Sequence, residues 1–175
     1  MGCKMKTLKD YFEEEYEAYE EPAKNRRGFK IKYIYIGPLY GADKDTRELK
    51  VIKFRMFFFL LLSAVLVIVG AFQKRDINYY SLSAALATIS MATLFFEVIG
   101  VFSFAFQSVV IKKQDFMHLE FLLKIAPVLN CTLLIMAMLF GLRIDLLVAL
   151  IYGASGVLSI GITHTYKMVR YEKRW

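Results

Sequence analysis

Cysteine is scarce in this sequence, and neither copy belongs to a cysteine motif. Among 175 residues there are two cysteines, Cys3 and Cys131, and no C-x-x-C pair is present. Cys3 lies next to the N-terminus, whereas Cys131 lies within a long apolar run. This arrangement excludes a disulfide framework.

Motifs of enzyme chemistry are absent as well. The two histidines, His118 and His164, belong to no H-x-x-x-H or H-E-x-x-H pattern, and there is no P-loop, nucleophile elbow or glycine-rich nucleotide fingerprint. Asp115 and Glu120 flank His118, but three polar residues within six are expected on any amphipathic helix at an interface. We therefore predict no enzyme activity, no catalytic residue, no metal site and no cofactor.

Long stretches of the chain lack charge altogether. The sequence is 57% apolar and only 22% charged, which is too apolar for an ordinary soluble domain of this length. A helix needs about 20 residues to cross a hydrocarbon core of roughly 30 Å. Four segments meet or approach that length, at residues 54–72, 80–106, 122–142 and 146–166. The predicted fold class is an all-α integral membrane protein, a four-transmembrane-helix bundle over residues 54–175.

Basic residues are distributed unevenly about these spans. One predicted side has only Lys74, Arg75 and Arg143. The other side carries Arg47, Lys50, Lys53, Arg55, Lys112, Lys113, Lys124, Lys167, Arg170, Lys173 and Arg174. Because cytoplasmic loops collect Lys and Arg, we expect a multi-pass plasma-membrane protein with both termini in the cytoplasm. Orientation and anionic lipid headgroups account for the net charge of +7, so no nucleic-acid partner is predicted.

Residues 1–53 form a predicted cytoplasmic tail whose first part is acidic and aromatic. Thr7 is a candidate N-cap and Pro22 a candidate end, so a helix is expected over about residues 7–21. Apolar side chains at helical spacing give it a candidate partner-docking stripe of Leu8, Tyr11, Phe12, Tyr16 and Tyr19. The polar face is rich in glutamate, whereas a helix that lies on a membrane is usually basic. We expect the stripe to dock onto protein, either a partner or the basic KNRRGFKIK segment of the same chain.

The second part of the tail has the pattern of a strand. In FKIKYIYIG, apolar residues alternate with Lys30 and Lys32 before the segment becomes apolar throughout, which predicts a strand over residues 29–36. One strand alone is unstable. We expect it to pair with a strand from a loop, from another copy or from another protein.

One carboxylate lies in the longest uncharged run. Glu97 falls within TLFFEVIGVF, and steps of three and four residues place it on one face with Ser90 and Thr93, from Ser83 to Gln107. This small, polar face is expected to point into the bundle. A charge at that depth costs about 3 kcal/mol or more on insertion scales, so Glu97 needs a partner, water or a proton.

Polar residues on the other predicted spans are candidate partners for Glu97. Asn130 lies a turn or two inside the third span, and a polar line follows the fourth span. The predicted intramembrane polar site comprises Glu97, Asn130, Ser90, Thr93, Ser155, Ser159 and Thr163. We expect the second and fourth spans to form the packed centre and the nearly featureless first span to face lipid.

Two functions and one structural role fit these features. The tail favours a non-catalytic accessory, scaffolding or regulatory subunit that docks a partner. The alternative is a homo-oligomeric small transporter or channel that uses Glu97 as an ion or proton site. In the structural role, Glu97 only joins helices within or between copies.

Overall fold

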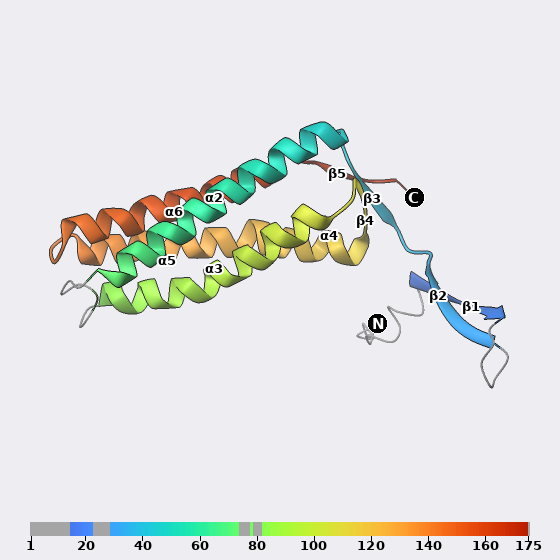
Figure 1. Ribbon diagram of the computed structural model, residues 1–175, viewed down its shortest axis with the longest axis horizontal. Helices are drawn as coiled ribbons and strands as arrows, with labels where there is room; N and C mark the ends of the chain where they lie inside the picture. The colour runs from blue at the N-terminus through green and yellow to red at the C-terminus, as the bar shows by residue number, and fades with distance from the viewer. Residues whose placement is uncertain (1–14, 23–28, 74–77, 79–81, 175) are drawn as a thin grey trace, which may run out of the picture.

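The computed structural model describes residues 15–22, 29–73, 78 and 82–174. It is mostly helical, with two small sheets at one end (Figure 1). Four helices are long and apolar enough to cross a membrane, and a small strand element precedes them. These four helices confirm the predicted helical bundle at that level.

The helices extend the predicted spans where local signals allow. Helix α2 covers Thr46–Phe72 and begins at Asp45, whose Oδ1 accepts a hydrogen bond from the Glu48 amide at 2.7 Å. Helices α3 and α6 cover Leu82–Phe106 and Leu146–Tyr166. The third long helix has three parts: α4 (Lys113–Glu120), the π-helical turn η2 (Phe121–Ile125) and α5 (Ala126–Gly141).

Proline explains the irregular turn in the third helix. Pro127 has no amide hydrogen, so the carbonyl of Leu123 lacks its ordinary donor four residues later. The Thr163 hydroxyl on α6 donates to that carbonyl at 2.9 Å. The hydrogen bond that is missing within the third helix is thereby replaced by one between two helices.

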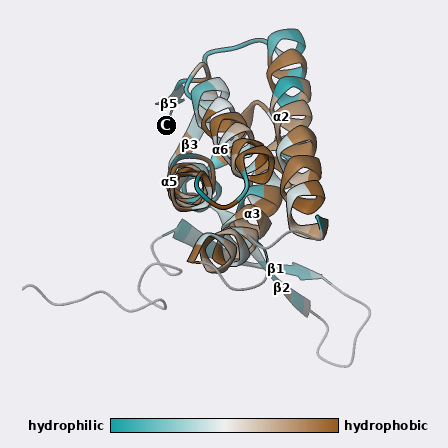
Figure 2. Cartoon of the chain, turned by 90° about the vertical axis from the view of Figure 1, so that its left-hand side faces the viewer, coloured by the Kyte–Doolittle hydropathy of each residue, from teal (hydrophilic) through white to brown (hydrophobic). Residues whose placement is uncertain are grey.

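The neighbours within the bundle differ from the expected ones. Helix α6 packs against α5 and α2, and α3 packs chiefly against α5 and also against α2, so α3 and α6 are diagonal. The end-on view shows the same order, with hydrophobic residues over most of each helix (Figure 2). The expectation that the second and fourth spans form the packed centre is wrong in this respect: the closest helix pair is α5 with α6. Gly156 allows that approach, since a Cβ there would lie 3.3 Å from the Cys131 carbonyl oxygen.

A three-stranded antiparallel sheet closes one end of the bundle. Strand β3 (Leu39–Ala42) lies between β4 (Val110–Lys112) and β5 (Tyr171–Lys173). It joins the chain before α2, the connection between α3 and α4, and the C-terminal segment. These three segments therefore lie at the same end of the bundle, opposite the end at which α2 stops and the α5–α6 connection lies (Figure 1).

A second sheet, the two-stranded β1–β2 hairpin, projects beyond this end (Figure 1). Strand β1 covers Tyr16–Pro22 and pairs antiparallel with β2, Phe29–Tyr35. The helix expected over residues 7–21 is therefore wrong for 16–21, and residues 7–14 lie outside the described part of the chain. The strand form wins because β2 needs a ladder partner, and β1 supplies one with glutamates near the β2 lysines, such as Glu21 Oε2 at 3.8 Å from Lys32 Nζ.

Candidate functional site

Glu97 lies at the centre of the bundle. The α3 face predicted from Ser83 to Phe104 is buried, and Glu97 itself is fully enclosed. Its Oε2 accepts a hydrogen bond from the Ser159 hydroxyl at 3.3 Å. Because α3 and α6 are diagonal, this bond crosses the middle of the bundle.

Asn130 bridges the helices around Glu97. Its Oδ1 accepts from the Thr93 hydroxyl at 2.9 Å, and its Nδ2 donates to Ser159 Oγ at 3.0 Å. One amide on α5 thus joins α3 to α6, as a buried amide with partners on both sides should. Thr93, Asn130, Ser159 and Glu97 form one connected group, which we call the central polar cluster.

The first long helix also reaches this cluster. Ser63 on α2 is fully buried, and its Oγ lies 2.8 Å from Ser155 Oγ and 3.3 Å from Ser159 Oγ. The expectation that this span is featureless and faces lipid overlooked Ser63. Its signal in the sequence is a lone hydroxyl in the FFFLLLSAVLV run, where an apolar residue would otherwise be usual.

Two predicted residues lie apart from the central polar cluster. The Ser90 hydroxyl donates to the Ala87 carbonyl within its own helix at 2.7 Å. Thr163 is committed to the Leu123 carbonyl near η2. The structure therefore brings together five of the seven predicted polar residues, namely Glu97, Asn130, Thr93, Ser155 and Ser159, and adds Ser63.

Only one of the two carboxylate oxygens of Glu97 has a hydrogen-bond partner among the described residues. Its Oε1 is buried and has no hydrogen-bond partner among the described residues. No described lysine, arginine or histidine forms an ion pair with it, and its neighbours in the cluster are neutral hydroxyl and amide groups. This carboxylate oxygen is therefore the atom at which the cluster would bind one cation or one proton.

The residues predicted for partner docking differ in whether and where the structure places them. Leu8, Tyr11 and Phe12 lie outside the described residues. Tyr16 contacts the Tyr35 ring edge-on at 5.2 Å between centroids, and Lys112 Nζ lies over both rings. Tyr19, at 59% exposure, remains on the open surface of the hairpin.

The base of the hairpin is fixed to the bundle by partly buried polar contacts. The Glu15 carboxylate is enclosed and accepts from Lys113 Nζ at 3.0 Å and from Gln114 Nε2 at 3.3 Å. The Tyr35 hydroxyl accepts from the Lys113 amide at 3.2 Å and donates to the Pro38 carbonyl at 3.0 Å. Burial raises the pKa of Tyr35 above its usual value, so this hydroxyl remains a donor.

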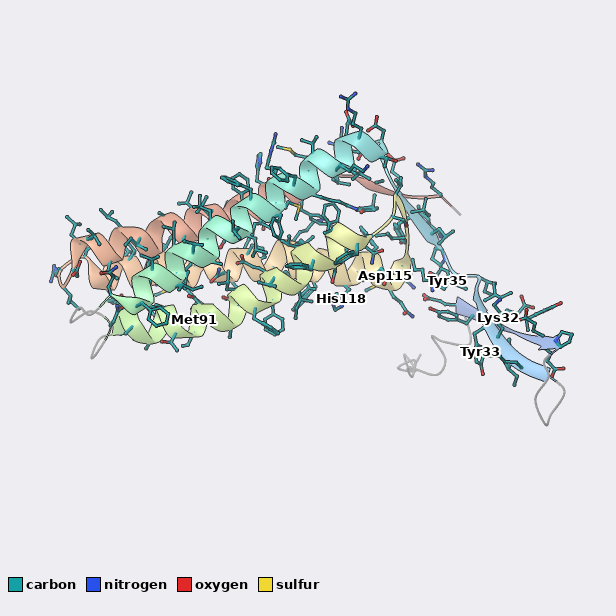
Figure 3. All side chains as sticks on the ribbon, viewed as in Figure 1. Lys32, Tyr33, Tyr35, Met91, Asp115 and His118 are labelled. Atoms are coloured by element: carbon teal, nitrogen blue, oxygen red, sulfur yellow. The ribbon has the colours of Figure 1, made fainter. Side chains whose placement is uncertain are left out.

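Beyond its base, the hairpin exposes apolar side chains on both faces. Ile31 and Tyr33 share one face, while Tyr19 and Ile34 share the other. All four are exposed, and Tyr33 lies well away from the bundle, whereas Tyr35 lies at its end (Figure 3). The prediction missed Ile31, Tyr33 and Ile34 because it assigned the docking surface to a helix.

The residues considered for acid–base chemistry lie on the bundle end. Asp115 and His118, both labelled in Figure 3, line a shallow cavity with Gln107 and Gln114. Within the described part of the chain, no group of three His, Cys, Asp or Glu side chains has the proximity needed to hold a metal ion. The chain matches no protein-family model, no curated protein and no solved structure.

Proposed function

We propose that the protein is a multi-pass plasma-membrane protein with its tail and C-terminal segment in the cytoplasm. The outer surfaces of the four long helices carry large exposed apolar side chains, such as Phe95 and Leu139, which suit contact with lipid. The tail, the α3–α4 connection and the C-terminal segment share one end of the bundle. That end holds most of the basic residues, as expected of a cytoplasmic side.

Its role in this proposal is that of a non-catalytic accessory or scaffolding subunit that docks a partner protein through the β1–β2 hairpin. The observation that carries this role is the apolar exposure of the hairpin, where Tyr33 remains 54% exposed. Lipid does not account for that exposure, because the hairpin projects past the closing sheet and away from the apolar helices (Figure 1). A two-stranded hairpin is marginal in water, so a further strand or surface would stabilise it.

The partner that best fits is an extended segment that adds to the edge of β2 facing away from β1, where no other described strand pairs. Strand addition satisfies the unpaired backbone groups at a sheet edge, and alternate side chains give specificity. On β2, Lys30 and Lys32 alternate with Ile31 and Tyr33. The complementary strand therefore alternates acidic with apolar residues, as β1 does where Glu21 lies opposite Lys30 and Ala18 lies opposite Tyr33.

A double substitution on the hairpin tests this role. We expect I31S with Y33S to remove a stoichiometric complex that the full-length protein forms when purified from its own membranes in mild detergent. The matched control is Val51→Ser, which changes an exposed apolar residue near the same bundle end but off the hairpin. The complex should survive in the control, and the β2 amides should gain protection from hydrogen exchange in the complex.

Three outcomes contradict the docking role. One is a complex that both variants retain, and another is β2 amides that exchange equally in free and bound protein. The third is a species whose mass is a whole multiple of this chain, since the hairpin of a second copy would then be the occupant.

A second candidate function rests on the unpartnered Oε1 of Glu97. In this candidate the bundle exchanges a proton or small cation at the central polar cluster. Glu97→Gln keeps the size and hydrogen bonding of the side chain but cannot take up a cation. Proton flux into liposomes should then stop in this variant while the bundle remains folded, and wild-type flux no greater than that of empty liposomes would reject the candidate.

A further inference from the structure

A cavity of about 440 Å³ opens between the third and fourth long helices at the end that carries the closing sheet. Its wall comprises Phe116 and Glu120 from α4, Lys124 from η2, and a run of five residues after α6, namely Lys167, Val169, Arg170, Tyr171 and Glu172. Lys167 directly follows Tyr166, the last residue of α6. The cavity is therefore level with the end of an apolar helix, where a bilayer would place its headgroups.

The charges in this cavity are not fully compensated from within. Lys124 pairs with Glu120 one turn earlier in the helix. The side chains of Lys167 and Arg170 make no ion pair with any acidic residue that the structure describes, and both residues are exposed. The wall therefore holds three cations against two carboxylates, Glu120 and Glu172, and its excess positive charge makes an anionic group the complementary ligand.

Aromatic side chains complete the cavity wall. The Phe116 and Tyr171 rings lie 5.6 Å apart between centroids, and such residues are enriched where a bilayer meets water. Burial raises the pKa of Tyr171 to about 12, so its hydroxyl remains a hydrogen-bond donor. Close by, the Tyr166 hydroxyl is enclosed and has no hydrogen-bond partner among the described residues.

Apolar side chains continue below the cavity along both helices. One turn after Lys124 the helix presents Val128, and two to three turns before Lys167, α6 presents Ile160 and Val157, which is 64% exposed. Helices α5 and α6 pack side by side, and these exposed apolar residues lie on the two helices next to the cavity in sequence. A charged cavity above an apolar strip matches the two ends of a lipid.

We propose that this cavity binds the phosphodiester headgroup of an anionic membrane lipid. Lys167 and Arg170 contact the phosphate oxygens, and Lys124 adds to the positive electrostatic potential there. The acyl chains lie against Val128, Val157 and Ile160. Basic cavities between spans at the cytoplasmic face are suited to such headgroups. The inference rests on the proposed membrane location but does not involve the docking hairpin, so either can fail alone.

The test compares two lipids on the full-length protein. Protein in mild detergent is mixed with phosphatidylglycerol or phosphatidylcholine, and native mass spectrometry measures how much of each lipid stays bound. Phosphatidylglycerol should bind preferentially. In the double variant Lys167→Gln with Arg170→Gln its affinity should fall about 30-fold, from two juxtamembrane charges.

The control variant is Arg47→Gln with Lys50→Gln, which removes two exposed basic residues from the same end of the bundle. Its affinity for phosphatidylglycerol should change no more than a few-fold. An equal loss of affinity in both variants would show diffuse attraction of the lipid to the basic surface and would overturn the proposal that the cavity is the binding site. Inorganic phosphate that binds with the same dependence on Lys167 and Arg170, with no preference between the lipids, would assign the site to free phosphate and overturn the lipid.

Discussion

Thr163 on α6 donates a hydrogen bond of 2.9 Å to the carbonyl of Leu123, the group that Pro127 leaves without a donor. The bond lies in the buried contact between the third and fourth long helices. A proline is thus tolerated in a long helix because a neighbouring helix supplies the missing donor.

Removal of this donor should destabilise the bundle. We expect Thr163→Val to lower the free energy of unfolding by about 1 kcal/mol, since it leaves the Leu123 carbonyl buried and unpaired. Thr163→Ser keeps the hydroxyl and should recover most of the loss. Unfolding in mixed detergent micelles measures both variants, and equal stability of valine and serine would contradict the role of the bond.

Asn130 and Thr93 should be energetically coupled. The bond between Asn130 Oδ1 and Thr93 Oγ1 joins α5 to α3 at 2.9 Å. In a double-mutant cycle with Asn130→Leu and Thr93→Val, we expect a coupling free energy of about 0.5–2 kcal/mol. A cycle of Asn130→Leu with Thr132→Val, whose hydroxyl donates only within α5, should give a value near zero.

Glu15 should hold the hairpin without supporting the bundle. Its buried carboxylate contacts Lys113 and Gln114, which belong to the start of α4. We expect Glu15→Ala to speed hydrogen exchange of the β1 and β2 amides by about tenfold or more, for a loss of about 1.5 kcal/mol or more. Exchange in the long helices should stay unchanged.

The control for this prediction is Glu17→Ala, which removes an exposed carboxylate two residues later, within β1. It should leave the exchange of the hairpin amides near the wild-type rate, because an exposed charge contributes little. Hairpin exchange that is insensitive to Glu15 would show that the contacts of Tyr16 and Tyr35 fix the hairpin without the Glu15 carboxylate.

The raised pKa of Tyr171 predicts that the folded protein loses stability at high pH. Its pKa is raised by burial from the ordinary value of 10.0 to about 12 in the folded protein. Between these values the unfolded chain loses the proton while the folded chain keeps it, so ionisation favours unfolding. This contribution to stability is complete below pH 10.0 and falls as the pH rises toward about 12.

Tyr171→Phe isolates this contribution, since it keeps the ring against Phe116 and removes the titrating hydroxyl. We expect the difference in unfolding free energy between wild type and variant to become smaller, or to reverse, above pH 10.0. A difference that stays constant across this pH range would show that Tyr171 does not titrate differently in the two states.

The buried face of α3 follows from the sequence. Small and polar residues recur there at helical spacing from Ser83 to Phe104, and these positions are the buried ones. The position of Asn130 one span away was also sufficient to name it as a partner of the cluster, because a buried amide in a long apolar helix needs hydrogen bonds. Ser63 was missed because a single hydroxyl gives no periodic pattern.

The tail shows where local patterns fail. Residues 16–21 have aromatic side chains at helical spacing, yet they form strand β1. The strand form depends on the hydrogen-bond ladder with β2, which lies seven or more residues away. The spacing of side chains within one segment does not reveal such a pairing. The same pairing moves the exposed apolar surface from the predicted stripe to Ile31, Tyr33 and Ile34.

The sequence by itself determined the number and approximate limits of the four apolar helices and the inward face of α3, because length and periodicity are properties of one segment. Only the tertiary structure decided that α3 and α6 are diagonal, that Ser63 joins the central polar cluster and that Thr163 completes the backbone broken at Pro127. A helix's apolar period records which face is buried but not which neighbour covers it. That choice depends on contacts between segments distant in sequence, and those contacts define the candidate sites.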